Sequence, residues 1–119
     1  TGKADRAGAW PAIAALINAT TGWDFDYDDV DLIGERAFTI KKAFNIREGW
    51  TRSDDALNYR WHHDPMTKGP SAGHVVTEEE LEYMKDLYYA AKGWTKDGLI
   101  PKEKLVALGM DDVAEQIGV

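Results

Sequence analysis

The sequence contains no cysteine among its 119 residues. Disulfide bonds, thiolate nucleophiles and thiolate ligands for zinc or an iron–sulfur cluster are therefore excluded within this chain. The sequence also lacks the run of about 20 apolar residues that a membrane-spanning helix needs, and it shows no signal-peptide pattern. The chain begins at Thr1 rather than Met, so we expect a processed chain or a piece of a longer one, with no membrane partner.

Positive charge is scarce. The chain has 14 basic and 21 acidic residues, which gives a formal net charge of −7. Binding to a phosphate backbone needs clustered lysine and arginine, and no basic stripe is present, so we expect no nucleic-acid partner. The hydrophobic share of 44% and the charged share of 29% are typical of a soluble globular protein. We expect a single domain over residues 1–119, with residues 1–9 frayed.

Alternating apolar and polar residues, the mark of a half-buried strand, are missing except for a possible short pairing at residues 75–76. The longest helical pattern is predicted from about Tyr27 to about Glu48, with Asp26 as N-cap and Gly49 closing the end. Its apolar positions fall on one narrow stripe: Val30, Ile33, Ala37, Ile40 and Phe44. Gly34 costs roughly 1 kcal/mol against alanine inside a helix, which predicts that another element packs closely there.

Four other segments have helical signals. A helix is predicted from about Pro11 to about Thr20, and a short turn over residues 56–61. Thr77 and Glu80 form a predicted capping box, which opens a helix that ends at Gly93. Its apolar residues stand at helical spacing: Leu81, Met84, Leu87, Tyr88 and Ala91. Short helices are predicted over residues 102–108 and 110–117. The predicted fold is all-α, an irregular helical bundle of about four main helices with long ordered loops.

A dense charged turn follows the central helix. Five residues are our candidates for holding this turn in place: Arg47, Glu48, Arg52, Asp54 and Asp55. Arginine can donate two parallel hydrogen bonds to a carboxylate, so one interpretation is a structural ion-pair turn. The other interpretation is that Arg47 or Arg52 faces a bound anion or substrate. The sequence leaves both open.

His62, His63 and Asp64 suggest a metal site by composition alone. Adjacent side chains on a regular element point in different directions, and no further ligand stands at a supporting spacing. We therefore predict histidines in a partly exposed loop, and we keep these three residues as weak metal candidates.

Several strings, in order, resemble one known family. They are NATTGWD at residues 18–24, IGER at 33–36, FNIREG at 44–49 and TRSDD at 51–55, followed by GP at 69–70, YY at 88–89, GW at 93–94 and DG at 97–98 before Pro101. Together they resemble the C-terminal helical region of the tungsten-dependent aldehyde:ferredoxin oxidoreductases. Residues 56–58 depart from the family pattern, which often has a leucine–proline pair there.

The resemblance implies a parent enzyme of the cytoplasm that carries a tungsten bis-pterin cofactor and one [4Fe–4S] cluster. Such an enzyme oxidises aldehydes to acids and passes electrons to ferredoxin. The matching strings look like scaffold, so we assign no catalytic and no cofactor-binding residue to this chain and expect it to bind no cofactor alone. Its expected partners are the remaining domains of the parent, with ferredoxin as the parent's electron partner.

Two rival functions remain open from the sequence. A free-standing acidic helical module could use its tryptophans and tyrosines to bind a protein. A small metal-binding protein could use His62, His63 and Asp64.

Overall fold

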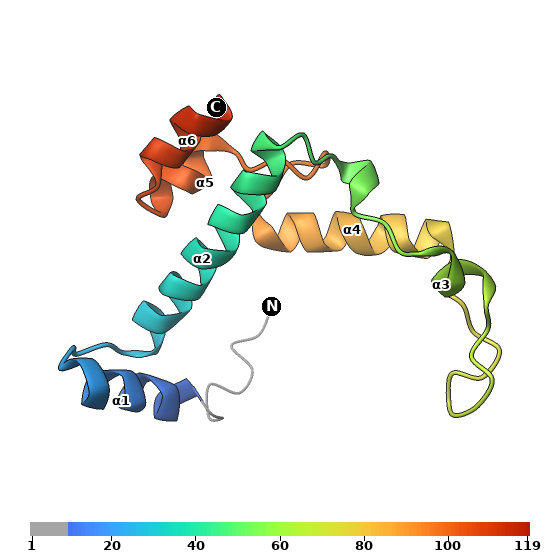
Figure 1. Ribbon diagram of the computed structural model, residues 1–119, viewed down its shortest axis with the longest axis horizontal. Coiled ribbons are helices and arrows are strands. Elements are labelled where there is room, and N and C mark those ends of the chain that lie inside the picture. Colours follow the sequence, from blue (N-terminus) through green and yellow to red (C-terminus); the bar gives the residue numbers. More distant parts are fainter. Residues whose placement is uncertain (1–9) are drawn as a thin grey trace. The chain divides into compact units, whose positions relative to one another are not determined.

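The computed structural model describes residues 10–119, and the segment predicted to be frayed lies outside them. The described part is helical, with no strand (Figure 1). Its elements, in order, are α1 (Trp10–Thr21), α2 (Tyr27–Arg47), the 3-10 turn η1 (Arg52–Asp54), α3 (Tyr59–His63), α4 (Glu78–Lys92), α5 (Lys102–Ala107) and α6 (Asp111–Ile117). The all-α prediction is confirmed. The long helices begin and end within one or two residues of their predicted limits.

The chain divides into two compact units, and the boundary falls between Lys41 and Lys42. In the first unit, Asn18 joins the end of α1 to the start of α2. Its Nδ2 donates to the carbonyl of Phe25 at 2.8 Å, and the Phe25 N–H donates back to its Oδ1 at 2.8 Å. Asp26 accepts a hydrogen bond from the Asp29 N–H at 3.0 Å, so the predicted N-cap of α2 is confirmed.

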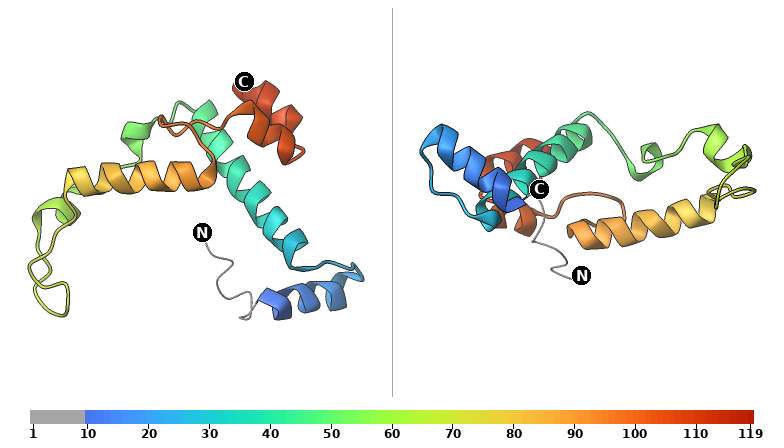
Figure 2. Two further views of the ribbon diagram at one scale, coloured as in Figure 1. Left: turned by 180° about the vertical axis from the view of Figure 1, so that it is seen from behind. Right: turned by 90° about the horizontal axis from the view of Figure 1, so that it is seen from below.

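The second unit contains the hydrophobic core. Tyr89 of α4 and Leu105 of α5 pack with Trp94 and Ile100, which lie between these helices. Ala43 of α2 and Ala114 of α6 complete the cluster together with Met110. α5 and α6 pack on each other and lie side by side in every view (Figures 1 and 2). The C-terminal helices therefore form a small hairpin against which α4 and the end of α2 are held.

Gly98 makes this packing possible. It has a φ of +74°, and a Cβ built there would lie 2.9 Å from Cζ of the Tyr89 ring. Only glycine can both take the left-handed conformation without strain and leave room for that ring. The turn containing Gly98 is closed by the Thr95 N–H, which donates to the Leu99 carbonyl at 2.9 Å.

The faces that the two long helices bury are not their apolar stripes. α2 buries Thr39, Lys42 and Ala43, whereas Ile40 and Phe44 of the predicted stripe are 53% and 55% exposed. α4 buries Lys85 and Tyr89, while most of its own predicted stripe is exposed. Periodicity alone shows that a face is apolar, but it does not show which neighbour covers that face.

One local expectation is wrong, and one possibility that the sequence left open does not occur. A Cβ at Gly34 would meet nothing within 4 Å, so no described element packs closely there. Val75 and Val76 form no strand; instead the Val76 N–H donates to the Trp61 carbonyl at 2.9 Å. Within residues 10–119, no helix is both long and apolar enough to cross a bilayer.

Candidate functional site

Arg52 joins the charged turn to α4. Its Nη2 and Nε donate to Oε2 of Glu82 at 2.6 and 3.0 Å, and its Nη1 donates to Oδ1 of Asp86 at 2.8 Å. The same Nη1 also donates to the Lys96 carbonyl at 2.6 Å. In return, Nζ of Lys85 donates to the Arg52 carbonyl at 3.3 Å. One guanidinium thus holds the turn, the middle of α4 and the loop after α4 together.

Asp55 is the second centre of this cluster. Its Oδ1 accepts from Nε1 of Trp50 at 2.7 Å, and its Oδ2 accepts from Nζ of Lys42 at 3.2 Å and from the hydroxyl of Tyr89. Lys42 is only 8% exposed, and its Nζ lies 5.1 Å from the centroid of the Trp94 ring. The carboxylate therefore balances a buried cation that also interacts with an aromatic face.

The pKa values follow from these contacts. Burial of the Asp55 carboxylate opposes its ionisation, but hydrogen bonds from Tyr89, Trp50 and Lys42 outweigh burial, so the pKa of Asp55 lies below its usual value. Burial, together with the neighbouring Asp55 carboxylate, raises the pKa of the Tyr89 hydroxyl. Hydrogen bonds from Lys85 and then Arg52 lower the pKa of Glu82. All these groups are held in their charged or hydrogen-bonding forms near neutral pH.

The five predicted turn residues do not all meet. Arg52 and Asp55 are the two centres of the cluster, and Asp54 accepts from the N–H and the hydroxyl of Thr51, both at 2.7 Å, which opens η1. Arg47 pairs instead with Glu48 at 3.1 Å, and both side chains are about half exposed. Because the donors of Arg52 point at Glu82, Asp86 and Lys96, the geometry favours a structural clamp over an anion site.

No local sequence pattern indicates the distant partners in this cluster. Lys42, Glu82, Asp86 and Tyr89 stand 13 to 34 residues from the turn residues that they contact. The one local signal is the i, i+3 spacing of Glu82 and Lys85 in α4, whose side chains pair at 2.5 Å. That pairing shows that the two charges share a helix face, but it does not show that Arg52 binds Glu82.

The three weak metal candidates each have a separate partner. Nδ1 of His62 contacts the Val76 carbonyl at 2.5 Å, while the His63 ring stacks on Tyr59 with centroids 3.9 Å apart. Asp64 accepts from Nε of Arg60 at 3.0 Å. In the described part of the chain, no group of three or more His, Asp or Glu side chains is placed to hold a metal ion.

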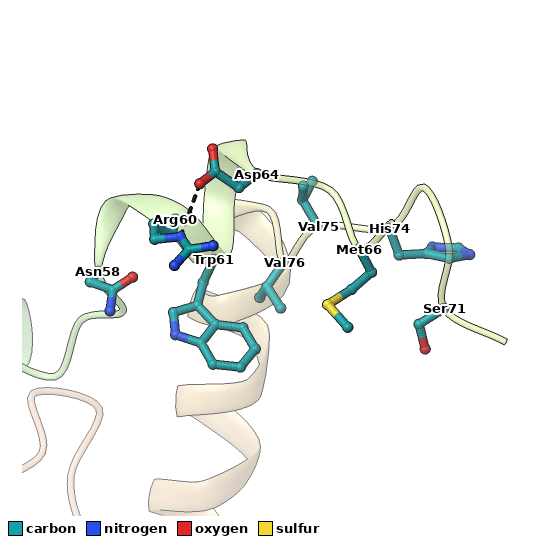
Figure 3. A pocket seen from close by; sticks show the side chains of 9 residues that line it. All are labelled: Asn58, Arg60, Trp61, Asp64, Met66, Ser71, His74, Val75 and Val76. Atoms are coloured by element: carbon teal, nitrogen blue, oxygen red, sulfur yellow. Dashed lines mark hydrogen bonds and ion pairs between the residues drawn. The ribbon is translucent and has the colours of Figure 1, made fainter. Parts of the chain in front are cut away.

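An open pocket of about 590 Å³ lies in the loop on both sides of α3 (Figure 3). Its walls combine apolar side chains with a polar rim: Trp61, Met66, Val75 and Val76 with Asn58, Arg60, Asp64, Ser71 and His74. The Met66 N–H donates to the His74 carbonyl at 3.2 Å, and the Gly73 N–H donates back to the Met66 carbonyl at 2.8 Å. The Arg60–Asp64 ion pair forms part of the rim in Figure 3. The charges of these two side chains therefore balance each other at the pocket.

The residues present do not fit an iron–sulfur cluster, whose irons are held by cysteine thiolates, because the chain has none. The turn cluster offers no free donor set either, since its arginine and lysine are directed at carboxylates and carbonyls. The arrangement can brace helices and loops.

Comparison with known proteins places this sequence in a family. The family model described as aldehyde ferredoxin oxidoreductase, domains 2 and 3, matches residues 2–110. The chain is 43% identical over 98 residues to the tungsten-containing aldehyde ferredoxin oxidoreductase of Pyrococcus horikoshii, and 45% identical over 96 residues to that of Pyrococcus furiosus. These matches cover 82% and 80% of this chain, but only 16% and 15% of the relatives.

The match includes α1, α2, the Arg52–Asp55 cluster, α4 and α5. The resemblance that these strings indicated is therefore confirmed over residues 2–110. This chain belongs to the aldehyde ferredoxin oxidoreductase family and corresponds to a C-terminal domain portion of those tungsten enzymes.

Proposed function

We propose that this chain is a scaffold portion of an aldehyde ferredoxin oxidoreductase-like enzyme and has no activity alone. In the longer protein it would support the cofactor-binding domains and help to wall the substrate channel. The observation that carries the proposal is the clamp on Arg52 and Asp55, which braces three segments and leaves its charged groups satisfied. Such a cluster stabilises a shape and offers nothing to a reacting atom.

The share of the relatives that the chain spans also supports this role. A segment that aligns with 15–16% of a tungsten enzyme, and that lacks cysteine, would leave the tungsten bis-pterin and the [4Fe–4S] cluster to the rest of the polypeptide. The whole protein would oxidise an aldehyde to an acid in the cytoplasm and pass the electrons to ferredoxin. The remaining domains of the same polypeptide would be the direct partners of this chain.

The test compares the full-length natural protein with the 119-residue chain. Both are assayed for aldehyde-dependent reduction of ferredoxin, at equal molar concentration and in the absence of oxygen. The proposal expects turnover from the full-length protein and none from the short chain, even after incubation with tungsten-pterin extract. Reproducible aldehyde oxidation by the short chain would overturn it, and so would a full-length protein that carries the cofactors but does not oxidise aldehydes.

A second candidate function is a free-standing acidic protein-interaction module. It is favoured by one specific observation, namely that apolar side chains such as Ile40, Phe44 and Leu87 are about half exposed. This candidate requires that the sequence exists in the cell as a short protein, and the size of the natural polypeptide separates the two.

A further inference from the structure

α4 carries a largely exposed apolar stripe, in which Tyr88 also contacts the ring of Trp94 edge-on, with centroids 5.7 Å apart. At about 100° per residue, positions 84, 87, 88 and 91 fall on one side of a helix. Met84, Leu87 and Tyr88 are 46%, 53% and 43% exposed, and Ala91 is exposed as well. We call these four residues the α4 stripe.

The side of α4 that is buried in the described structure is not the side that carries the stripe. α4 turns Lys85 and Tyr89 inward, and it holds the charged turn through Glu82 and Asp86. A helix whose only neighbours were those in this chain would place its apolar residues on that side. Its polar side is fixed there by four hydrogen bonds that Arg52 donates to Glu82 and Asp86, so α4 cannot rotate to bury the stripe without breaking them.

α2 repeats this arrangement independently. Its buried side includes Lys42 and Ala43, while Ile33 and Ile40 of its apolar stripe are about half exposed. Two helices with apolar residues at helical spacing on an exposed side are typical of surfaces that a further segment covers.

We propose that the α4 stripe is an intramolecular docking surface that seats an apolar segment of the longer polypeptide to which the chain belongs. The inference rests on the proposed function and adds the surface that carries the contact. The occupant follows from length, because the chain spans only 15–16% of the relatives it matches, which leaves most of such a polypeptide available. The stripe itself holds no charge, so the segment that it seats is apolar.

The test measures covalent labelling by a photogenerated carbene, which inserts into exposed C–H bonds and needs no oxidant. The 119-residue chain and the full-length natural polypeptide are labelled under the same conditions, and mass spectrometry reads each methionine. Met110 is 3% exposed and serves as the buried reference. In the short chain we expect Met84 to label at least ten times more than Met110. In the full-length polypeptide we expect labelling of Met84 to fall at least tenfold.

Equal labelling of Met84 in the two proteins overturns the inference and leaves the proposed function standing. Protection of Met84 in the short chain also overturns it. Protection that disappears on dilution would mean that a second copy covers the stripe, and protection that persists would mean that the 119 residues cover it themselves. If Met110 labels strongly, the short chain is unfolded, and the urea-unfolded full-length polypeptide becomes the exposed reference. If no longer polypeptide carries the sequence, the proposed function and the inference both fail.

Two matched variants distinguish an effect on docking of the α4 stripe from an effect on folding. Leu87→Glu places a charge within the stripe, and Ala90→Glu places the same charge at an exposed position of α4 outside it. In the short chain we expect both to melt within about 2 °C of the parent chain. In the full-length polypeptide, Leu87→Glu is expected to raise labelling of Met84 at least fivefold, and Ala90→Glu is expected to leave it unchanged. Equal labelling of Met84 in these two variants would overturn the inference.

Discussion

Asp55 accepts hydrogen bonds from Trp50, Lys42 and Tyr89, and each of these would lose a charged acceptor if the carboxylate were replaced. Asp55→Asn leaves the buried Lys42 ammonium without its counter-charge. Hydrogen bonds to charged groups contribute about 1.5–3 kcal/mol each, and a buried charge left unpaired costs more. Because Asp55 keeps 29% side-chain exposure, we expect Asp55→Asn to lower the free energy of unfolding by about 2 kcal/mol.

Urea unfolding of the 119-residue chain measures this change. Asp64→Asn is the matched control, because Asp64 pairs with Arg60, which is 83% exposed, and exposed pairs contribute about 0–1 kcal/mol. A loss as small for Asp55→Asn as for Asp64→Asn would contradict the role of the cluster as a clamp.

The lowered pKa of Asp55 also predicts a pH dependence. A carboxyl whose pKa is lower in the folded state stabilises the fold above its unfolded pKa of about 3.9. That contribution is lost as the pH falls through the lower, folded value. Between about pH 5 and pH 2, we therefore expect the free energy of unfolding to fall more steeply in the parent chain than in Asp55→Asn. Parallel pH curves for the two proteins would show that Asp55 is not the group responsible.

Alanine variants of Gly98 and Gly109 distinguish the cost of a steric clash from the cost of a left-handed backbone conformation. Both have positive φ, +74° and +65°, but a Cβ at Gly98 meets the Tyr89 ring, whereas one at Gly109 meets nothing within 4 Å. Each change to alanine incurs a left-handed cost of about 1–2 kcal/mol. We expect Gly98→Ala to destabilise the chain by at least about 1 kcal/mol more than Gly109→Ala, because overpacking adds to that cost. Thermal unfolding of both variants checks this, and equal losses would show that the Tyr89 ring moves aside freely.

At the scale of elements, local chemistry fixes where the helices begin. Thr77 accepts from the Glu80 N–H at 3.1 Å, and Glu80 accepts from the Thr77 N–H at 2.8 Å, which is the predicted capping box. Replacing such a cap by alanine costs about 1 kcal/mol. Thr77→Ala is therefore expected to lower the free energy of unfolding by about that amount. Glu79→Gln, in the same helical turn, is the control. Thr95→Val is not suitable as a control, because the Thr95 hydroxyl itself accepts a hydrogen bond from the Leu99 N–H.

Circular dichroism during urea unfolding gives the comparison. The prediction fails if Thr77→Ala and Glu79→Gln unfold at the same urea concentration. Glu79 makes no capping contact with Thr77, so its amide is expected to change stability by less than about 0.5 kcal/mol.

These elements show which parts of the fold a sequence can predict. Caps and glycine ends act over three or four residues, so Asp26, Thr77 and Gly93 placed α2 and α4 within one or two residues. The short 3-10 turn was not predicted, since it depends on Asp54 accepting from Thr51. The buried faces were not predictable either, because burial of Lys42 and Lys85 depends on acceptors contributed by distant segments.

At the scale of the whole molecule, the family can be recognised from the order of the sequence strings, but the site can be recognised only in part. Arg52 and Asp55 were recognisable as turn residues from their local charge. Their partners Glu82, Asp86 and Tyr89 lie on a helix 30 or more residues away, and nothing in the local sequence indicates that α4 presents its polar side to the turn. The pocket around Trp61 likewise depends on the loop folding back, so that Met66 and His74 pair through the backbone.

The two exposed stripes, and the 15–16% of the relatives' length that the chain spans, both support the proposal that this chain is part of a larger protein. The most direct measurement is the size of the natural polypeptide that carries the sequence, found by mass spectrometry of tryptic peptides from size-separated cell extract. We expect peptides of residues 42–119 to come from a polypeptide several times heavier than 13.3 kDa, together with peptides that contain cysteine. Recovery of these peptides only from a protein of about 13.3 kDa would contradict the account.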